Sequence, residues 1–143
     1  MNPRLLLCLC LTPLLVACAK EPAGYEIDGG NHSLTVERNK PYFWSEGWEL
    51  DLIVTRYPEC QRRYPLKKAG EKVRVDLYRT PGGAYILNQG KRWYVAETQT
   101  CRMQQYEEAP PEPGELLGSF RVKNGTFAFV PEAGVRDQES GIR

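Results

Sequence analysis

The sequence is poor in the residues that most catalytic and metal sites require. It contains a single histidine, His32, and no Cys-x-x-Cys pair, so the usual zinc and redox ligand sets are missing. A Ser-His-acid triad or a Cys-His pair would have to use His32, which follows the turn-like segment Gly29-Gly30-Asn31. The glycine-rich motifs that hold nucleotide phosphates are also missing. We therefore predict no metal site, no cofactor and no catalytic residue from motifs.

The sequence also has no excess of charge and no long apolar run after residue 17. It has 19 basic and 18 acidic residues, and Arg4 is the only charge within residues 1–17, so the remaining chain is balanced. Nucleic-acid binding demands a basic face, and this balance argues against it. No later stretch approaches the roughly 20 apolar residues of a transmembrane helix. A 143-residue chain with 41% hydrophobic residues suits one packed domain.

The N-terminus has the pattern of an export signal. Arg4 gives it a positive start, residues 5–15 form an apolar run, and Leu15-Val16-Ala17-Cys18 follows. This tetrapeptide, in this position, resembles the lipobox of bacterial lipoproteins. The resemblance implies cleavage before Cys18, a diacylglycerol on its sulfur, and a fatty acid such as palmitate on the new amine. Residues 1–17 are then a signal peptide, and Cys18 is the lipidation site.

Two features of the same segment bear on where the protein goes. Ala17-Cys18-Ala19 also fits ordinary signal peptidase, which would cut after Ala19 and release an unlipidated protein. Cys8 and Cys10 lie within the apolar run, and we expect both to be removed with the signal. In Gram-negative lipoproteins an Asp after the lipidated cysteine causes retention in the inner membrane. Ala19 at that position favours the periplasmic leaflet of the outer membrane, although Lys20 next to it affects sorting in some lineages.

Two cysteines remain beyond Cys18, namely Cys60 and Cys101. The oxidising periplasm favours a disulfide between them. The chain-entropy model gives about 4 kcal/mol of stabilisation for a loop of this length. The alternatives are free thiols, or a metal pair completed by His32.

The hydrophobic pattern predicts an all-β domain over residues 25–131. In residues 48–55 every second residue is apolar, and the residues between them are polar except for Ile53. Residues 73–78 repeat the alternation with Val73, Val75 and Leu77. Asn124-Gly125 lies between two alternating segments, which predicts a hairpin with a type I′ turn over residues 120–129. Short strands at this spacing indicate an antiparallel meander with one disulfide, forming either a barrel or a two-layer sandwich.

Three segments lack such a pattern. Residues 18–24 are expected to form a short linker between the lipidated N-terminus and the domain. Residues 107–115 contain three prolines and four glutamates, and they predict a solvated connection between strands. Residues 132–143 are rich in glycine and charge, which is typical of a flexible C-terminal tail.

Residues 56–68 are the most unusual local feature, because Arg-Tyr-Pro occurs there twice and basic residues outnumber acidic ones. Arginine forks suit carboxylates and phosphates, so this segment is a candidate surface for an anionic group. Its candidate binding residues are Arg56, Arg62, Arg63 and Tyr64. The alternative is a solvated loop whose tyrosines pack on the sheet.

Four aromatic residues surround another predicted loop, at positions 42, 43, 44 and 48. They can form cross-strand core pairs, or they can stack on peptidoglycan sugars or contact a protein partner. Trp44 is nearest the loop tip and is the candidate binding residue among them.

These observations favour a lipid-anchored protein of the bacterial envelope that acts as a non-catalytic binding or assembly module. Its expected partners are the membrane, through the acyl chains on Cys18, and either another envelope protein or peptidoglycan. Two alternatives stay open. One is a small envelope hydrolase that uses paired carboxylates, and the other is a periplasmic carrier of an apolar ligand.

Overall fold

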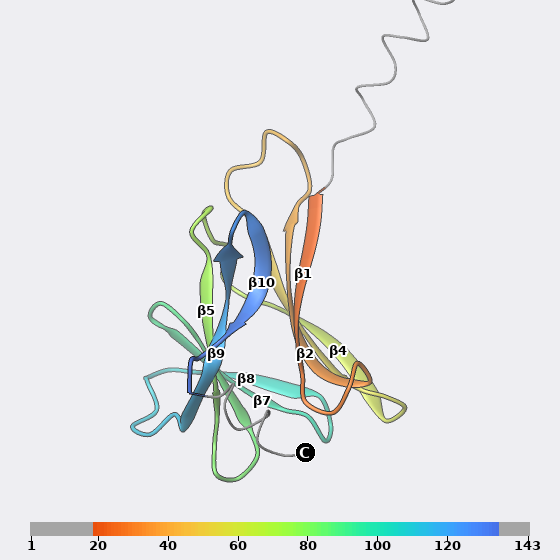
Figure 1. Ribbon diagram of the computed structural model, residues 1–143, viewed down its shortest axis with the longest axis vertical. Helices are drawn as coiled ribbons and strands as arrows, with labels where there is room; N and C mark the ends of the chain where they lie inside the picture. The colour runs from red at the N-terminus through yellow and green to blue at the C-terminus, as the bar shows by residue number, and fades with distance from the viewer. Residues whose placement is uncertain (1–18, 135–143) are drawn as a thin grey trace, which may run out of the picture.

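The computed structural model describes residues 19–134, which fold entirely into β-strands and connections (Figure 1). Every strand pair is antiparallel. The ten strands are β1 (Ala19–Glu26), β2 (His32–Lys40), β3 (Glu49–Arg56), β4 (Cys60–Pro65), β5 (Arg74–Arg79), β6 (Tyr85–Gln89), β7 (Arg92–Glu97), β8 (Arg102–Tyr106), β9 (Glu115–Lys123) and β10 (Thr126–Pro131). The all-β prediction is confirmed.

The strands form two sheets rather than one. The first is a simple meander in the order β1-β2-β3-β4, and the second has the order β10-β9-β5-β6-β7-β8. The connection between β8 and β9, residues 107–114, carries the chain to the other side of β5. The two sheets pack as two layers, and within residues 19–134 no hydrogen-bonded ring of strands closes a barrel. Of the two predicted architectures, the structure has the sandwich.

Alternation along the strands determines which side chains fill the space between the layers. In β3, Leu50, Leu52 and Val54 are buried while the residues between them face outward or toward neighbouring strands. The second sheet contributes an equivalent inner face. Both sheets share one core, whose fully buried members include Leu34, Val36, Leu52, Val54, Val75, Leu77, Leu87 and Phe120. The predicted inward face of residues 48–55 is therefore confirmed.

The predicted hairpin at Asn124-Gly125 is present as the turn between β9 and β10. Both residues have positive φ angles, 52° and 77°, as a type I′ turn requires. Lys123 pairs with Thr126 directly across the turn. Local sequence was sufficient here because the turn residues alone fix the register of the two strands.

The structure differs from the sequence-based prediction mainly at the predicted linker, residues 18–24. Residues 19–24 belong to β1, which pairs with β2 from Ala19 opposite Lys40 to Glu26 opposite Ser33. These residues lack an apolar pattern because β1 lies at the edge of its sheet and is held mainly through its backbone, with Ala23 buried. Pro22 is compatible with such an edge position. Residues 19–24 therefore belong to the β-sheet, and they do not form the predicted linker.

Cys18 and residues 1–17 lie outside the described residues, as do residues 135–143 of the predicted tail. Glu132 still donates its backbone N–H to the carbonyl oxygen of Leu117, just beyond β10. Within residues 19–134 no helix is long and apolar enough to cross a membrane.

Candidate binding surfaces at the two ends of the sandwich

The strands of the first sheet run between two ends of the molecule that differ in chemistry (Figure 1). The aromatic end consists of the start of β1, the loop over residues 41–48, and the segment over residues 66–73. Ala19 pairs with Lys40 there, and Trp48 exchanges two backbone hydrogen bonds with Ala69. The disulfide end consists of the turns over residues 27–31, 57–59 and 98–101. Every residue predicted to take part in binding can be placed relative to these two ends.

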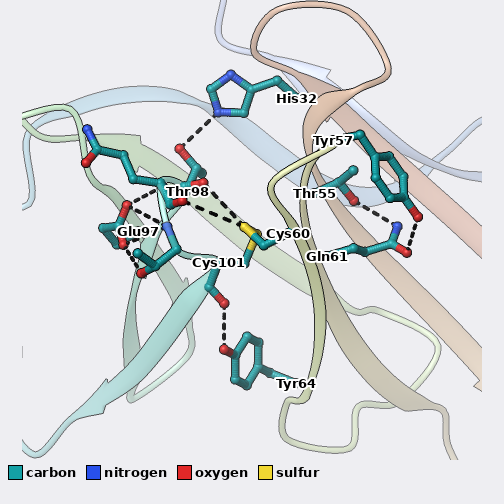
Figure 2. Close-up of a disulfide and its surroundings, with 11 residues drawn as sticks. His32, Thr55, Tyr57, Cys60, Gln61, Tyr64, Glu97, Thr98 and Cys101 are labelled. Carbon is teal, nitrogen blue, oxygen red and sulfur yellow. Dashed lines mark hydrogen bonds between the residues drawn. A yellow bond between two sulfur atoms is a disulfide. The ribbon is translucent and has the colours of Figure 1, made fainter.

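The predicted disulfide is present, and it lies at the disulfide end. Cys60 and Cys101 are bonded, with their Cα atoms 6.0 Å apart (Figure 2). Cys60 begins β4 at the edge of the first sheet, and Cys101 precedes β8 at the edge of the second. The bond therefore joins the two layers along one open side of the sandwich.

Glu97 organises the turn that presents Cys101. Its carboxylate accepts hydrogen bonds from the backbone N–H of Gln99, from the backbone N–H of Thr100, and from the Thr100 hydroxyl at 2.5 Å (Figure 2). The Thr100 hydroxyl contributes most to lowering the pKa of Glu97, and the two backbone donors lower it further. The carboxylate thus stays ionised, and it holds the chain in the turn where Cys101 has a φ of 56°.

Tyr64 points from β4 toward the same turn. It is half-buried, and its hydroxyl donates a 2.6 Å hydrogen bond to the carbonyl oxygen of Cys101 (Figure 2). The ring packs against the core. Tyr64, predicted as a binding residue, therefore has a defined contact inside the domain.

Arg63 lies on the outer face of the first sheet and is paired. Its Nη1 is 2.9 Å from Glu37 Oε1 and 2.9 Å from Asp51 Oδ2. The hydrogen bond to Glu37, followed by that to Asp51, raises the pKa of Arg63. The two acids flank the arginine because Glu37 pairs with Asp51 in register across β2 and β3. An anionic ligand at Arg63 would compete with two carboxylates.

Arg56 and Arg62 are the predicted arginines whose charge is available. Within residues 19–134 neither forms a salt bridge. Arg62 is exposed on β4, one residue from Arg63 but without its acidic neighbours. Arg56 ends β3 and lines a cleft of about 370 Å³ at the disulfide end, together with His32, Tyr85, Glu97 and Thr98. In this cleft the Nε2 atom of His32 lies 2.9 Å from the Thr98 hydroxyl (Figure 2).

The cleft offers donors to a small anionic group, and the Glu97 carboxylate that also lines it would compete for them. Arg56 supplies a forked donor, and the imidazole and hydroxyl beside it supply further hydrogen-bonding atoms. The sequence shows His32 after a turn-like segment, and the structure places it at the start of β2. No sequence pattern singles out Thr98. The two residues are 66 positions apart, so only the packing of β2 against the turn after β7 brings them together. No local pattern in the sequence signals that contact.

The four aromatic residues around residues 41–48 divide into two groups. Trp48 is 7% exposed and belongs to the core side of the loop, with the Arg38 guanidinium 4.1 Å from its ring centre. Tyr42, Phe43 and Trp44 are 52%, 77% and 65% exposed. The predicted core role is therefore correct for Trp48. Trp44 is exposed as expected, and Tyr42 and Phe43 are exposed as well.

The three exposed rings form one cluster, which we call the aromatic tip. Tyr42 and Trp44 are stacked, with ring centres 4.8 Å apart and an interplanar angle of 10°. Phe43 meets Trp44 edge to face at the same distance. Such contacts shape the tip into a compact apolar surface that solvent surrounds.

Lysines line a cleft formed in part by residues 67–73 of the aromatic end. This open cleft of about 610 Å³ is lined by Lys67, Lys68, Lys72, Arg74 and Lys91, with Asp76 as its one acid. Lys67 and Lys68 belong to the predicted basic segment, residues 56–68. The structure separates them from Arg56 by the length of β4, so this segment does not act as one basic patch.

Comparisons of the chain with protein-family models, with curated protein sequences and with solved structures found no match.

Proposed function

We propose that this chain is a lipid-anchored protein of the bacterial cell envelope and that it acts as a non-catalytic binding module. Its anchor is Cys18, whose acyl chains lie in the leaflet of the outer membrane that faces the periplasm. Its binding surface is the disulfide end, where Arg56 and Arg62 meet acidic groups of another envelope protein or of peptidoglycan.

The observation that carries the proposal is the position of β1. It begins at Ala19, one residue after the lipobox cysteine, and pairs residue by residue with β2. An acyl group on Cys18 is therefore attached to the sheet itself, without an intervening linker. Two or three acyl chains, each contributing about 0.8 kcal/mol per buried CH₂ group, exceed what stable anchoring needs.

The length of the strands separates anchor and binding surface. The nine residues of β2, at about 3.3 Å per residue, place the disulfide end roughly 26 Å from the aromatic end. The anchor confines the cationic groups of Arg56 and Arg62 to a thin layer above the membrane. This confinement raises the effective concentration of the binding surface for partners in the same layer.

The interior of the domain favours a binding module over a carrier of an apolar ligand. The side chains of both sheets fill the space between the layers with one continuous core. The clefts described above are open to solvent and lined mainly by polar or charged residues. Recognition on the outside of the domain fits this construction.

Site-specific photo-crosslinking in living cells tests the proposal. A photoreactive amino acid at the exposed position 59 is used in every protein. It is expected to capture a partner in the otherwise unmodified protein, and this capture should be lost when Arg56→Glu and Arg62→Glu are combined. Arg92→Glu is the matched control, because Arg92 is exposed at the opposite end of β7 from the disulfide and forms no salt bridge within residues 19–134. Identical captured neighbours in all three proteins would reject the disulfide end as the binding surface.

A further inference from the structure

We infer that the aromatic end is a membrane-contacting surface, in which the aromatic tip enters the interface of an anionic phospholipid bilayer and the surrounding lysines lie over its phosphates. This inference deepens the proposed function and rests on it, because the same bilayer holds the acyl chains of Cys18. It assigns the aromatic tip to lipid rather than to a protein or to a sugar.

The first argument is position. Lys40 ends β2 directly before the loop that carries the aromatic tip, and Ala19 is its partner across the ladder. The chain that leads to Cys18 therefore leaves the domain beside this loop, as Figure 1 shows for the start of β1 and the connection between β2 and β3. A bilayer that receives acyl chains at residue 18 lies next to the aromatic tip without any movement of the domain.

The second argument is the chemistry of the tip. Tryptophan and tyrosine favour the boundary between headgroups and acyl chains, since each has an apolar ring and a polar atom. Tyr42 and Trp44 provide two such rings, and Phe43, the most exposed of the three, provides a fully apolar one. More than half of each side chain is exposed to water, and a bilayer interface would bury these exposed faces.

The third argument is that hydrogen bonds and close packing fix the loop that carries the aromatic tip. Ser45 donates its backbone N–H to the carbonyl oxygen of Tyr42, which closes a tight turn. Below it, Gly47 has a φ of 71°, and a Cβ atom there would lie 2.8 Å from the carbonyl oxygen of Ala69. Trp48 is bonded to Ala69 through both of its backbone groups. The loop therefore presents its rings from a fixed support instead of folding them onto the sheet.

The fourth argument is charge. The segments of the aromatic end carry lysines at positions 20, 40, 67, 68 and 72, and glutamates lie in or next to the same segments at positions 46, 49 and 71. Lys40 pairs with Glu71 at 3.2 Å, and Lys68 pairs with Glu49 at 3.5 Å. Among residues 19–134, Lys20, Lys67 and Lys72 have no salt-bridge partner. These free ammonium groups complement the phosphates of anionic lipids.

Tryptophan quenching by bromine-labelled lipids tests the inference on the full mature protein purified from membranes. In vesicles of phosphatidylethanolamine and phosphatidylglycerol, bromine placed just below the headgroups is expected to quench part of the fluorescence. Trp44→Phe should abolish most of that quenching. Trp93→Phe is the matched control and should preserve it, because Trp93 lies on β7 against Tyr78, away from the aromatic tip.

A second pair of variants tests the charges. Combining Lys67→Glu with Lys72→Glu should reduce quenching in these vesicles to the level seen in phosphatidylcholine alone. Arg102→Glu is the control and should leave the quenching unchanged, because Arg102 is exposed on β8 next to Cys101 of the disulfide. Equal quenching of all charge variants in both kinds of vesicle would overturn the role of the lysines.

The mass of the N-terminal residue, measured on the same sample, separates this inference from the proposed function. Acyl chains on Cys18 without quenching of Trp44 would overturn the inference and leave the anchor in place. Quenching of Trp44 in an unacylated protein would support the membrane-contacting tip and reject the anchor. The inference would be overturned if lipid does not quench Trp44 and a photoreactive amino acid at position 44 crosslinks to a protein in cells. That result would assign the tip to a protein partner.

Discussion

The hydroxyl of Tyr64 donates a 2.6 Å hydrogen bond to the carbonyl oxygen of Cys101, one residue from the start of β8. Tyr64 belongs to the first sheet and Cys101 leads into the second. The bond therefore reinforces the disulfide, which joins the same two edges four residues earlier in β4. Together these two links close one side of the sandwich.

Tyr64→Phe is expected to lower the free energy of unfolding by about 1–2 kcal/mol, because it removes the donor and leaves the carbonyl of a buried residue without it. Urea unfolding followed by tryptophan fluorescence measures this change. Tyr57→Phe is the control. Its hydroxyl donates to Gln61 Oε1 at 2.7 Å on the exposed side of the hairpin, and its loss should change stability by less than about 0.5 kcal/mol. Equal effects of the two variants would contradict the role assigned to Tyr64.

Removal of the disulfide has a larger expected effect. The bonded cysteines are 41 positions apart, and the chain-entropy model gives about 4 kcal/mol for a loop of this length. The double variant Cys60→Ala and Cys101→Ala should lose about that much free energy of unfolding. Reduction of the unmodified protein should produce the same loss and should have no effect on the double variant. Titration of two free thiols in the denatured, unreduced protein would contradict the disulfide itself.

The disulfide and the main strands were accessible from the sequence because their signals are local or involve few candidates. The alternation of Leu50, Leu52 and Val54 predicts an inward face. The conformational preferences of Asn124-Gly125 predict a turn. Only two cysteines remained to be paired. In each case the number of alternatives was small before any tertiary contact was known.

Other features depend on contacts that no local pattern encodes. Residues 19–24 form a strand because their backbone pairs with β2, and such backbone pairing requires no particular pattern of side chains. Arg63 is paired because the fold places Glu37 and Asp51 in register beside it. The aromatic residues near the loop had two possible roles, since a ring at position 44 and a ring at position 48 look alike in sequence. The bend of the chain at Gly47 separates them.

The stability of the turn before Cys101 should depend on pH through Glu97. Hydrogen bonds from Thr100 and Gln99 lower the pKa of this carboxyl below 4.5 in the folded protein. The unfolded state therefore binds the proton more readily, so the stabilisation is fully present above pH 4.5 and is lost as the pH falls through the lowered pKa. Because the carboxylate is partly exposed, the effect is less than about 1 kcal/mol.

Urea unfolding of the unmodified protein and of Glu97→Gln over a range of pH checks this expectation. The difference in the free energy of unfolding between the two proteins should be constant near neutral pH and should shrink below pH 4.5. Glu108→Gln is the control, since Glu108 is exposed in the connection between β8 and β9 and forms no salt bridge within residues 19–134. A difference that persists unchanged into strong acid would contradict the assigned role of the Glu97 carboxylate.

Acylation at Cys18 is the prediction on which the proposed location depends, and three cysteines near the N-terminus allow a matched test. Cells grown with an alkyne-labelled fatty acid should incorporate the label into the unmodified protein and into variants Cys8→Ala and Cys10→Ala, because cleavage before Cys18 removes those two residues. Cys18→Ala should carry no label. Label that survives in Cys18→Ala would place the acyl chain elsewhere, and absence of label from all four proteins would favour cleavage after Ala19. In the latter case β1 would begin at the new N-terminus, Lys20, and would lose its ladder pair between Ala19 and Lys40.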